Sequence, residues 1–161
     1  MRNDMTVPSG DGLVNLRVGA IIMKDGKLLM VGNRYHNYLY SVGGRIQFGE
    51  TAEEAVVREA EEETGVRLDI DRLGFVHENY FYGDMPWNER LLIYEVAFYF
   101  YMRVPEGFEP VCKSVIEDGT EEFLEWVSPD EPRAIYPEFF REALKRPEHT
   151  VKHFVTDERK G

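Results

Sequence analysis

The chain has 161 residues, 43% of them hydrophobic, which is enough for one globular domain with a proper core. Its formal net charge of −11 excludes a protein that follows a nucleic-acid backbone, because such proteins need a basic surface. The single Cys112 excludes an internal disulfide, and the longest apolar run, residues 91–102, is too short to cross a bilayer. We therefore expect a cytoplasmic protein, with no membrane and no duplex nucleic acid among its partners.

The first part of the chain predicts short strands that lead into a glycine-rich loop. The strands are expected at residues 13–23, 27–31 and 38–42. Asp25-Gly26, between the first two, is a dipeptide typical of tight hairpins. Gly43, Gly44 and Gly49 border a polar loop, and glycine lets a backbone approach a ligand closely.

A helix is predicted from about Thr51 to Thr64. Thr51 followed by Glu54 fits a capping box, in which the hydroxyl and the carboxylate satisfy early backbone N–H groups. Gly65 stands where a C-terminal glycine cap belongs. The residues between are mostly good helix formers.

The glutamates of this helix divide into two sets when they are placed at about 100° per residue. The apolar stripe that should face the core consists of Ala52, Ala55, Val56 and Ala60. The set that faces away from it, a solvated face without function, consists of Glu53, Glu54 and Glu61. The set on or beside the stripe consists of Glu59, Glu62 and Glu63.

The second set needs compensation for its charge. Carboxylates at i, i+3 and i+4 project together, and mutual repulsion would push at least one towards protonation. A hard cation such as Mg²⁺ or Mn²⁺ removes the problem because it favours oxygen ligands. Arg58 can reach Glu62 at i+4, but one guanidinium cannot neutralise three carboxylates. Taken alone, such a triplet is more typical of a charged surface helix.

The rest of the chain predicts three more strands and one more helix. The strands are expected at residues 68–82, 91–103 and 123–127, with a loop over 104–120. A helix is expected from Pro137 to Lys145, ended by Pro147. Residues 1–12 and 148–161 are interpreted as polar termini of a single domain that spans residues 1–161.

The loop and the first helix together form one ordered pattern. Gly44 is followed by five residues and Glu50, then by seven residues and the run REAEEETGV from Arg58 to Val66. This pattern resembles the Nudix box of the Nudix hydrolases at every fixed position. Ala60 is smaller than the bulky aliphatic residue usual there, and Val42 replaces a frequent proline, but neither departure touches a charged position.

The resemblance implies a fold and a reaction. The fold is an α/β/α sandwich with a mixed sheet between helices. The reaction is hydrolysis of the pyrophosphate bond in a nucleoside diphosphate linked to another moiety, with Mg²⁺ or Mn²⁺ as cofactor. The chemistry requires charge neutralisation of the phosphates, an oriented water and a base.

The resemblance also implies roles for residues of the box. Glu59, Glu62 and Glu63 match the metal ligands, and Glu62 and Glu63 are also assigned to catalysis. Arg58 matches the arginine that orients the glutamates. Glu50 supports Arg58 or adds a ligand, and the Gly44 carbonyl is a further ligand.

The general base stays open between the box and a later acidic loop. That loop offers Glu117, Asp118, Glu121 and Glu122. Glu121 and Glu122 come first because they lead directly into the strand at Phe123. For any single one of these residues, a solvated loop position is the alternative.

Substrate binding is assigned to aromatic and basic residues outside the box. Aromatic rings can stack on a nucleobase, and arginines can bind phosphate. The candidates are Arg34, Tyr38, Tyr82, Trp87 and Arg90. Most strand aromatics belong to a core, which is the alternative for the tyrosines.

ADP-ribose or a related nucleotide sugar is the first substrate expected. Pro86 lies somewhat late for the proline associated with that branch, whereas Tyr82 lies nearer the tyrosine associated with dinucleoside polyphosphate cleavage. Damaged nucleoside triphosphates are a third alternative. A non-catalytic nucleotide sensor would usually lack box glutamates, and all of them are present here. A homodimer is compatible with this interpretation.

Overall fold

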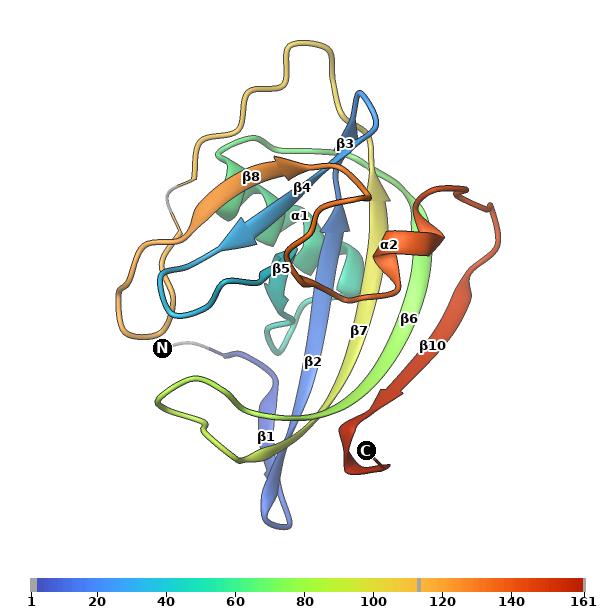
Figure 1. Cartoon of the computed structure of the whole chain (residues 1–161). Coiled ribbons are helices and arrows are strands. Elements are labelled where there is room, and N and C mark those ends of the chain that lie inside the picture. The colour runs from blue at the N-terminus through green and yellow to red at the C-terminus, as the bar shows by residue number, and fades with distance from the viewer. Residues whose placement is uncertain (1–2, 113, 161) are drawn as a thin grey trace.

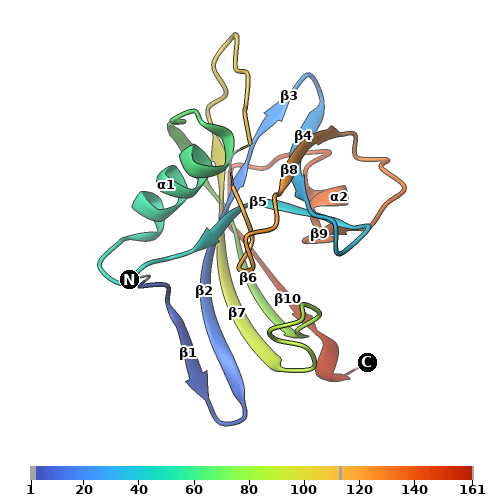
Figure 2. The ribbon, with the colours of Figure 1, turned by 90° about the vertical axis from the view of Figure 1, so that its left-hand side faces the viewer.

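The computed structural model describes residues 3–112 and 114–160, and the chain there forms a mixed sheet with α1 and α2 on opposite faces (Figures 1 and 2). The strands are β1 (Thr6–Ser9), β2 (Gly12–Ile21), β3 (Met23–Lys24), β4 (Lys27–Gly32), β5 (Leu39–Arg45), β6 (Ile70–Tyr82), β7 (Leu92–Met102), β8 (Phe123–Val127), β9 (Ile135–Tyr136) and β10 (Lys152–Asp157). The helices are α1 (Ala52–Thr64), α2 (Phe140–Ala143) and the 3₁₀ turn η1 (Glu158–Lys160).

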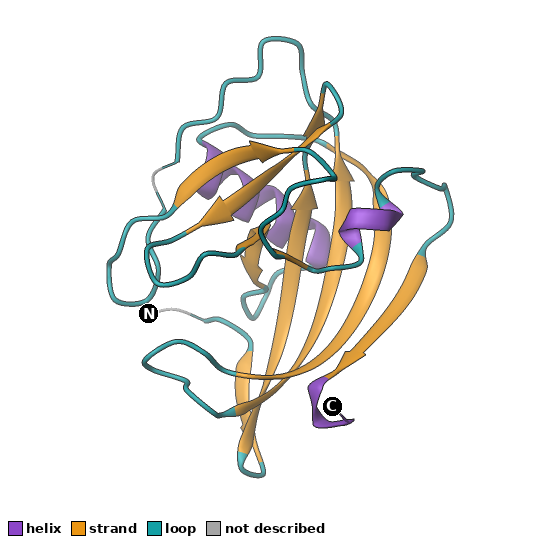
Figure 3. Ribbon diagram, in the orientation of Figure 1, coloured by secondary structure: helices purple, strands orange, loops and turns teal. Residues whose placement is uncertain are grey.

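The sheet runs in the order β10-β6-β7-β2-β5-β4-β3, and β1, β8 and β9 pair with β2, β4 and β5 (Figure 3). β2 pairs with β7 in parallel and with β5 antiparallel, while β6 and β7 form a long antiparallel pair. A mixed sheet with helices on both faces confirms the predicted α/β/α architecture.

Two apolar clusters hold the layers together. On the α1 side, Val56 and Ala60 are buried against Val18 and Phe100 of the sheet. The second cluster contains α2 and the aromatic residues Phe75, Tyr99 and Phe140. A fully buried Val or Phe side chain contributes about 1.5–3 kcal/mol, so contacts such as that of Val56 fix α1 on the sheet.

Most predicted elements are confirmed. β3 and β4 meet at Asp25-Gly26, where both residues have positive φ (52° and 75°), as a two-residue hairpin turn requires. β6, β7 and β8 occupy the three later predicted strands to within two residues at each end. Residues 104–112 and 114–120 form a loop that contains one isolated bridge, from Val115 to Glu121.

Three features differ from the prediction. β5 does not end at residue 42, because Gly43, Gly44 and Arg45 pair with β2. α2 covers four residues instead of nine, since the turn after Pro137 is closed by tighter i→i+3 bonds such as Phe140 N to Pro137 O (3.2 Å). β1, β9 and β10 lie where no strand was predicted, the first and last within the polar termini.

Candidate active site

α1 begins and ends as its sequence predicts. The Thr51 hydroxyl accepts from the Glu54 N–H at 3.2 Å, and the Glu54 carboxylate accepts from the Thr51 N–H at 3.0 Å, which completes the capping box. Gly65 ends the helix with φ 74°, and its N–H donates to the Glu61 carbonyl. Both ends of α1 are therefore fixed, which sets the direction in which each residue between them projects from the helix axis.

Burial distinguishes Glu59 and Glu63 from the solvated set, but not Glu62. Glu53, Glu54 and Glu61 are exposed, which confirms the predicted solvated face. In the other set, the exposed fraction increases from Glu63 to Glu59 to Glu62. Glu63 is only 6% exposed, the Glu59 side chain is 13% exposed, and the Glu62 side chain is 56% exposed at the margin of the stripe.

Arg58 connects the box glutamates. Its Nε and Nη2 donate to the two carboxylate oxygens of Glu50 at 2.6 and 2.9 Å, a bidentate pair. Nη1 donates to Glu59 at 2.9 Å and to Glu62 at 3.3 Å. Nη2 also reaches the Arg45 carbonyl at 3.1 Å, so the guanidinium ties α1 to the end of β5.

The paired glycines of β5 make room for two of these carboxylates. A Cβ on Gly44 would lie 2.4 Å from the Glu59 carboxyl carbon, so any side chain there would displace that carboxylate. The Gly43 N–H donates to Glu63 Oε2 at 3.3 Å, and a Cβ on Gly43 would lie 2.1 Å from the Val18 carbonyl oxygen. Glycine at both positions lets α1 approach β5 closely enough for these contacts.

The pKa of Glu63 is raised well above its usual range by burial first, and then by the negative charges of Glu122 and Glu59. Burial also raises the pKa of Glu59, although Arg58 acts in the opposite direction. The Arg58 hydrogen bonds lower the pKa of Glu50. The site thus contains one buried carboxylate whose ionised form needs more positive charge than its described surroundings supply.

The acidic loop before β8 brings one of its four carboxylates to this group. Glu122 accepts a short hydrogen bond from the Tyr40 hydroxyl of β5, and its charge acts on Glu63. Glu121 is exposed and forms the backbone bridge to Val115. The other two lie at the surface, where Glu117 pairs with Arg45 at 3.2 Å and Asp118 accepts from Tyr35 and from the Thr120 N–H.

The model of the NUDIX domain matches residues 14–153, which include the whole box and the acidic loop. The chain belongs to the NUDIX family. A MutT-like protein of Streptomyces ambofaciens is 36% identical over 61 residues, 38% of this chain and 40% of that protein. An ADP-ribose pyrophosphatase of Methanocaldococcus jannaschii is 46% identical over 52 residues, 30% of this chain and 31% of that protein. The matched stretches thus span well under half of these relatives.

A solved structure agrees over a longer stretch of this NUDIX chain. The MutT NUDIX hydrolase of Burkholderia pseudomallei superimposes with a TM-score of 0.57 at 27% identity, over 77% of this chain and 91% of that one. The agreement supports the fold described above. No helix in the described part of the chain is long and apolar enough to cross a membrane.

The residues of the NUDIX box fit a hard divalent cation in their chemistry. Glu63 offers a buried carboxylate with a raised pKa, and Glu59 offers another beside Gly44. Within residues 3–112 and 114–160, no three such side chains are already gathered around one point. Three of the carboxylates, those of Glu50, Glu59 and Glu62, are bonded to Arg58 instead. Glu59 and Glu62 each accept from Arg58 through one carboxylate oxygen, so a cation would bind the other oxygen while the guanidinium holds the carboxylate.

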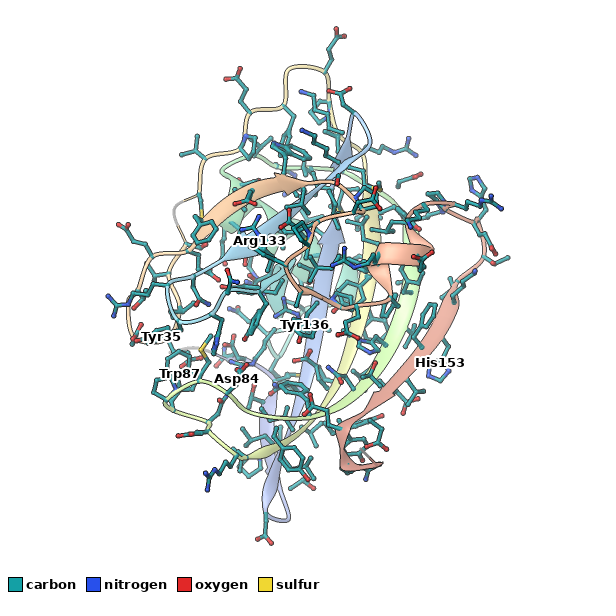
Figure 4. All side chains as sticks on the ribbon, viewed as in Figure 1. Tyr35, Asp84, Trp87, Arg133, Tyr136 and His153 are labelled. Carbon is teal, nitrogen blue, oxygen red and sulfur yellow. The ribbon has the colours of Figure 1, made fainter. Side chains whose placement is uncertain are left out.

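Some of the predicted substrate residues gather at the far end of β5 from the box. Tyr38 donates to Asp84 of the β6–β7 loop at 2.9 Å, and its ring lies 5.0 Å from that of Tyr136. Trp87, 41% exposed, meets Tyr35 edge-on with ring centroids 6.5 Å apart. Figure 4 shows Tyr35, Asp84 and Trp87 side by side in the view, with Tyr136 above them.

The remaining predicted substrate residues are more dispersed. Arg34 is exposed and lies over the Tyr35 ring at 5.3 Å. Arg90 is exposed on the turn before β7, with φ 64°. Tyr82 is exposed at the end of β6, where its N–H donates to Glu158 of η1. These positions leave Tyr38 and Trp87 as the candidates with aromatic neighbours.

An open hollow lies on the outer side of α1. It is lined by Glu53, Glu54, Val57, Arg58, Glu61, Glu62, Arg67 and Ile70. Its lining includes the solvated glutamates, Arg58 and Glu62, but neither Glu63 nor Glu122.

Sequence reasoning missed two residues of the site. Arg17 of β2 donates to the Ser41 carbonyl at 3.2 Å, and its charge acts on both Glu59 and Glu63. Tyr40 of β5 accepts from Asn33 and donates to Glu122. Only the pairing of β2 and the bonding of Glu122 bring them to the box, and neither leaves a local signal in the sequence.

Proposed function

We propose that this NUDIX protein hydrolyses the pyrophosphate bond of a nucleoside diphosphate linked to another moiety, with ADP-ribose or a related nucleotide sugar as substrate. The observation that carries the proposal is the Arg58 network beside the buried Glu63 carboxylate. The ADP-ribose pyrophosphatase among the relatives supports the substrate class, although the similarity covers only 52 residues.

Each box residue then has a separate task. Glu59, Glu62 and Glu63, with the Gly44 carbonyl, would hold Mg²⁺ or Mn²⁺, which neutralises phosphate charge and activates water when bound. Arg58 holds Glu59 in place, and Glu50 anchors Arg58 through its bidentate bond. A network of this kind keeps the carboxylates oriented before substrate arrives, so that little reorganisation is needed during the reaction.

We assign the general base to Glu122 rather than Glu121. Of the two, Glu122 is partly buried, bonds to Tyr40 of β5 and acts by its charge on Glu63, whereas Glu121 is exposed. A base must lie within hydrogen-bond reach of the water that it deprotonates, either directly or through another water. The position of Glu122 beside the box supports this role.

Substrate binding is assigned to the aromatic residues next to Tyr40. The Tyr38 ring lies 6.3 Å from that of Tyr40, so the aromatic group begins immediately beside the proposed base. Trp87 is exposed enough to offer a face to a nucleobase, a contact worth about 1–3 kcal/mol. Arg34 and Arg90 are exposed candidates for the phosphates.

The test is phosphate-ester release from a panel of nucleotides with Mg²⁺, with Mn²⁺, and with chelator. The panel contains ADP-ribose, another nucleotide sugar, a dinucleoside polyphosphate, and normal and oxidised nucleoside triphosphates. We expect metal-dependent cleavage, with the highest kcat/KM for ADP-ribose or the nucleotide sugar. A higher value for another panel member would replace the substrate class. Binding without cleavage of any member would favour the nucleotide sensor.

A further inference from the structure

Three hydrogen bonds run in one direction from the β4–β5 loop to Glu122. The Tyr35 N–H donates to Asn33 Oδ1 at 2.9 Å. Asn33 Nδ2 donates to the Tyr40 hydroxyl oxygen at 3.1 Å. The Tyr40 hydroxyl in turn donates to Glu122 Oε2 in a short bond.

The direction of this series of hydrogen bonds follows from its donor and acceptor groups. A backbone N–H can only donate, so the Asn33 oxygen must face Tyr35 and its NH₂ group must face Tyr40. A tyrosine hydroxyl has a single hydrogen, and the Asn33 amide approaches the oxygen as a donor. The Tyr40 hydrogen is therefore directed to the carboxylate of Glu122.

The donors Asn33 and Tyr40 lie in or next to strands of the sheet, whereas the acceptor Glu122 lies in the acidic loop. Tyr40 is in β5, where it pairs with Val31 of β4 and with Tyr136 of β9. Asn33 is 3% exposed at the end of β4. Glu122 belongs to the acidic loop, and its backbone is held by Ser114 and by the Cys112 thiol.

The Glu122 carboxylate also faces a group that repels it. The charge of Glu122 acts unfavourably on Glu63, which is buried on α1. A partly buried loop carboxylate under such repulsion would turn to solvent unless a donor held it. Tyr40 supplies that donor, and it also occupies Oε2, which leaves Oε1 to take a proton from water.

We propose that Tyr40, oriented by Asn33, is a positioning residue that holds the Glu122 carboxylate towards Glu63 for the hydrolytic step. The inference rests on the proposed function. It predicts that the Tyr40 hydroxyl matters for turnover only through Glu122.

The experiment is a double-mutant cycle on kcat with the best substrate of the panel. The variants are Tyr40→Phe, Glu122→Gln and the two together. We expect Tyr40→Phe to lower kcat about tenfold, equivalent to about 1.4 kcal/mol, with KM changed less than about twofold. Glu122→Gln should cost more, and adding Tyr40→Phe to it should change kcat by no more than about twofold.

Tyr94→Phe is the matched control. The Tyr94 hydroxyl donates to Glu78 at 2.6 Å, so this variant removes the same kind of bond between β6 and β7. It should leave kcat near the wild-type value. Melting temperatures of both Phe variants show whether a loss of kcat follows from a loss of stability.

The outcomes separate the two proposals. Normal turnover in Tyr40→Phe, or in Glu122→Gln, overturns the positioning role while wild-type activity still supports the proposed function. Equal losses from Tyr40→Phe with and without Glu122→Gln also overturn it, because the hydroxyl would then act independently of the carboxylate. An inactive wild-type protein instead contradicts the proposed function, and the positioning role with it.

Discussion

Glu63 is almost fully buried, whereas Glu61, two residues earlier in the same helix, is exposed. The difference decides what each carboxylate can do. An exposed carboxylate is screened by water and interacts weakly with its neighbours. A buried one keeps its charge only with a partner, so Glu63 is the residue of α1 whose ionisation most needs a cation.

Six single Glu→Gln variants should therefore fall into two groups. Glu59→Gln, Glu62→Gln and Glu63→Gln should each lower kcat/KM about a hundredfold or more, as for other losses of electrostatic stabilisation of about 2.7 kcal/mol. The other three, at Glu53, Glu54 and Glu61, should stay near wild type, with stability changed by less than about 0.5 kcal/mol. Glutamine preserves the capping box at Glu54. A severe loss at Glu53 or Glu61 would place the metal elsewhere.

Arg58→Lys tests the network with the charge retained. An ammonium cannot supply the bidentate bond to Glu50 while also reaching Glu59 and the Arg45 carbonyl. We expect a loss of kcat of at least about tenfold, with the circular dichroism spectrum unchanged. Arg67→Lys is the control, because Arg67 is exposed and makes only a 4.0 Å pair with Glu61 among its described contacts. Near-normal turnover in Arg58→Lys would reduce Arg58 to a surface partner.

At the residue scale, sequence spacing predicted which side chains of α1 lie close together, because helical geometry fixes their relative positions. The same geometry correctly placed Glu62 within reach of Arg58, at 3.3 Å. The meeting of Glu122 and Tyr40 could not be predicted in this way, since the two residues are 82 positions apart. Their contact depends on the path of the acidic loop, for which the sequence contains no periodic pattern.

At the scale of elements, α1 and β10 show opposite behaviour. α1 contains its own start and stop signals, and its bounds differ from the prediction by one residue. β10 has a mixed pattern, with Val155 and Thr156 exposed and Phe154 half-buried, because it is an edge strand paired only with β6 in the described sheet. An edge strand buries little, so its sequence resembles a polar tail.

β10 covers His77 of β6, which gives the strand a pH-dependent contact. His77 Nε2 lies 2.8 Å from the Thr156 hydroxyl, and its ring lies 5.0 Å from that of Phe139. Burial first, and then the charge of His153, lowers the pKa of His77 from 6.5 to about 4. The folded protein therefore holds this histidine neutral at a pH where the unfolded chain protonates it.

The sign of the effect on stability follows from proton linkage. Between about pH 6.5 and pH 4 the unfolded state binds more protons at His77, so the free energy of unfolding falls as the pH decreases. One group contributes a slope of at most about 1.4 kcal/mol per pH unit. Urea unfolding at pH 7.5 and pH 5 should show a smaller difference in His77→Gln than in the wild type.

His149→Gln is the control for this comparison, because His149 is exposed. It should keep the wild-type pH dependence. An unchanged difference between the two pH values in His77→Gln would show that acid destabilisation arises from other groups.

At the scale of the whole molecule, the balance of 19 basic and 30 acidic residues leaves a net charge of −11. A charge of this size repels itself and draws cations to the surface in general. Any salt should therefore stabilise the fold to some extent. A specific site is distinguished from this general effect by cation identity, by concentration and by dependence on particular residues.

Mg²⁺ or Mn²⁺ at millimolar concentration should raise the melting temperature by mass action, because the folded protein binds the ion and the unfolded chain does not. NaCl at matched ionic strength should give a smaller shift. In the double variant Glu59→Gln/Glu63→Gln, the part of the melting-temperature shift that exceeds the NaCl shift should disappear. The control is Glu53→Gln with Glu61→Gln, which removes the same two charges from the exposed side of α1 and should keep it. If both double variants respond alike, the ion is screening the net charge, and the carboxylates beside Gly43 and Gly44 do not form the metal site.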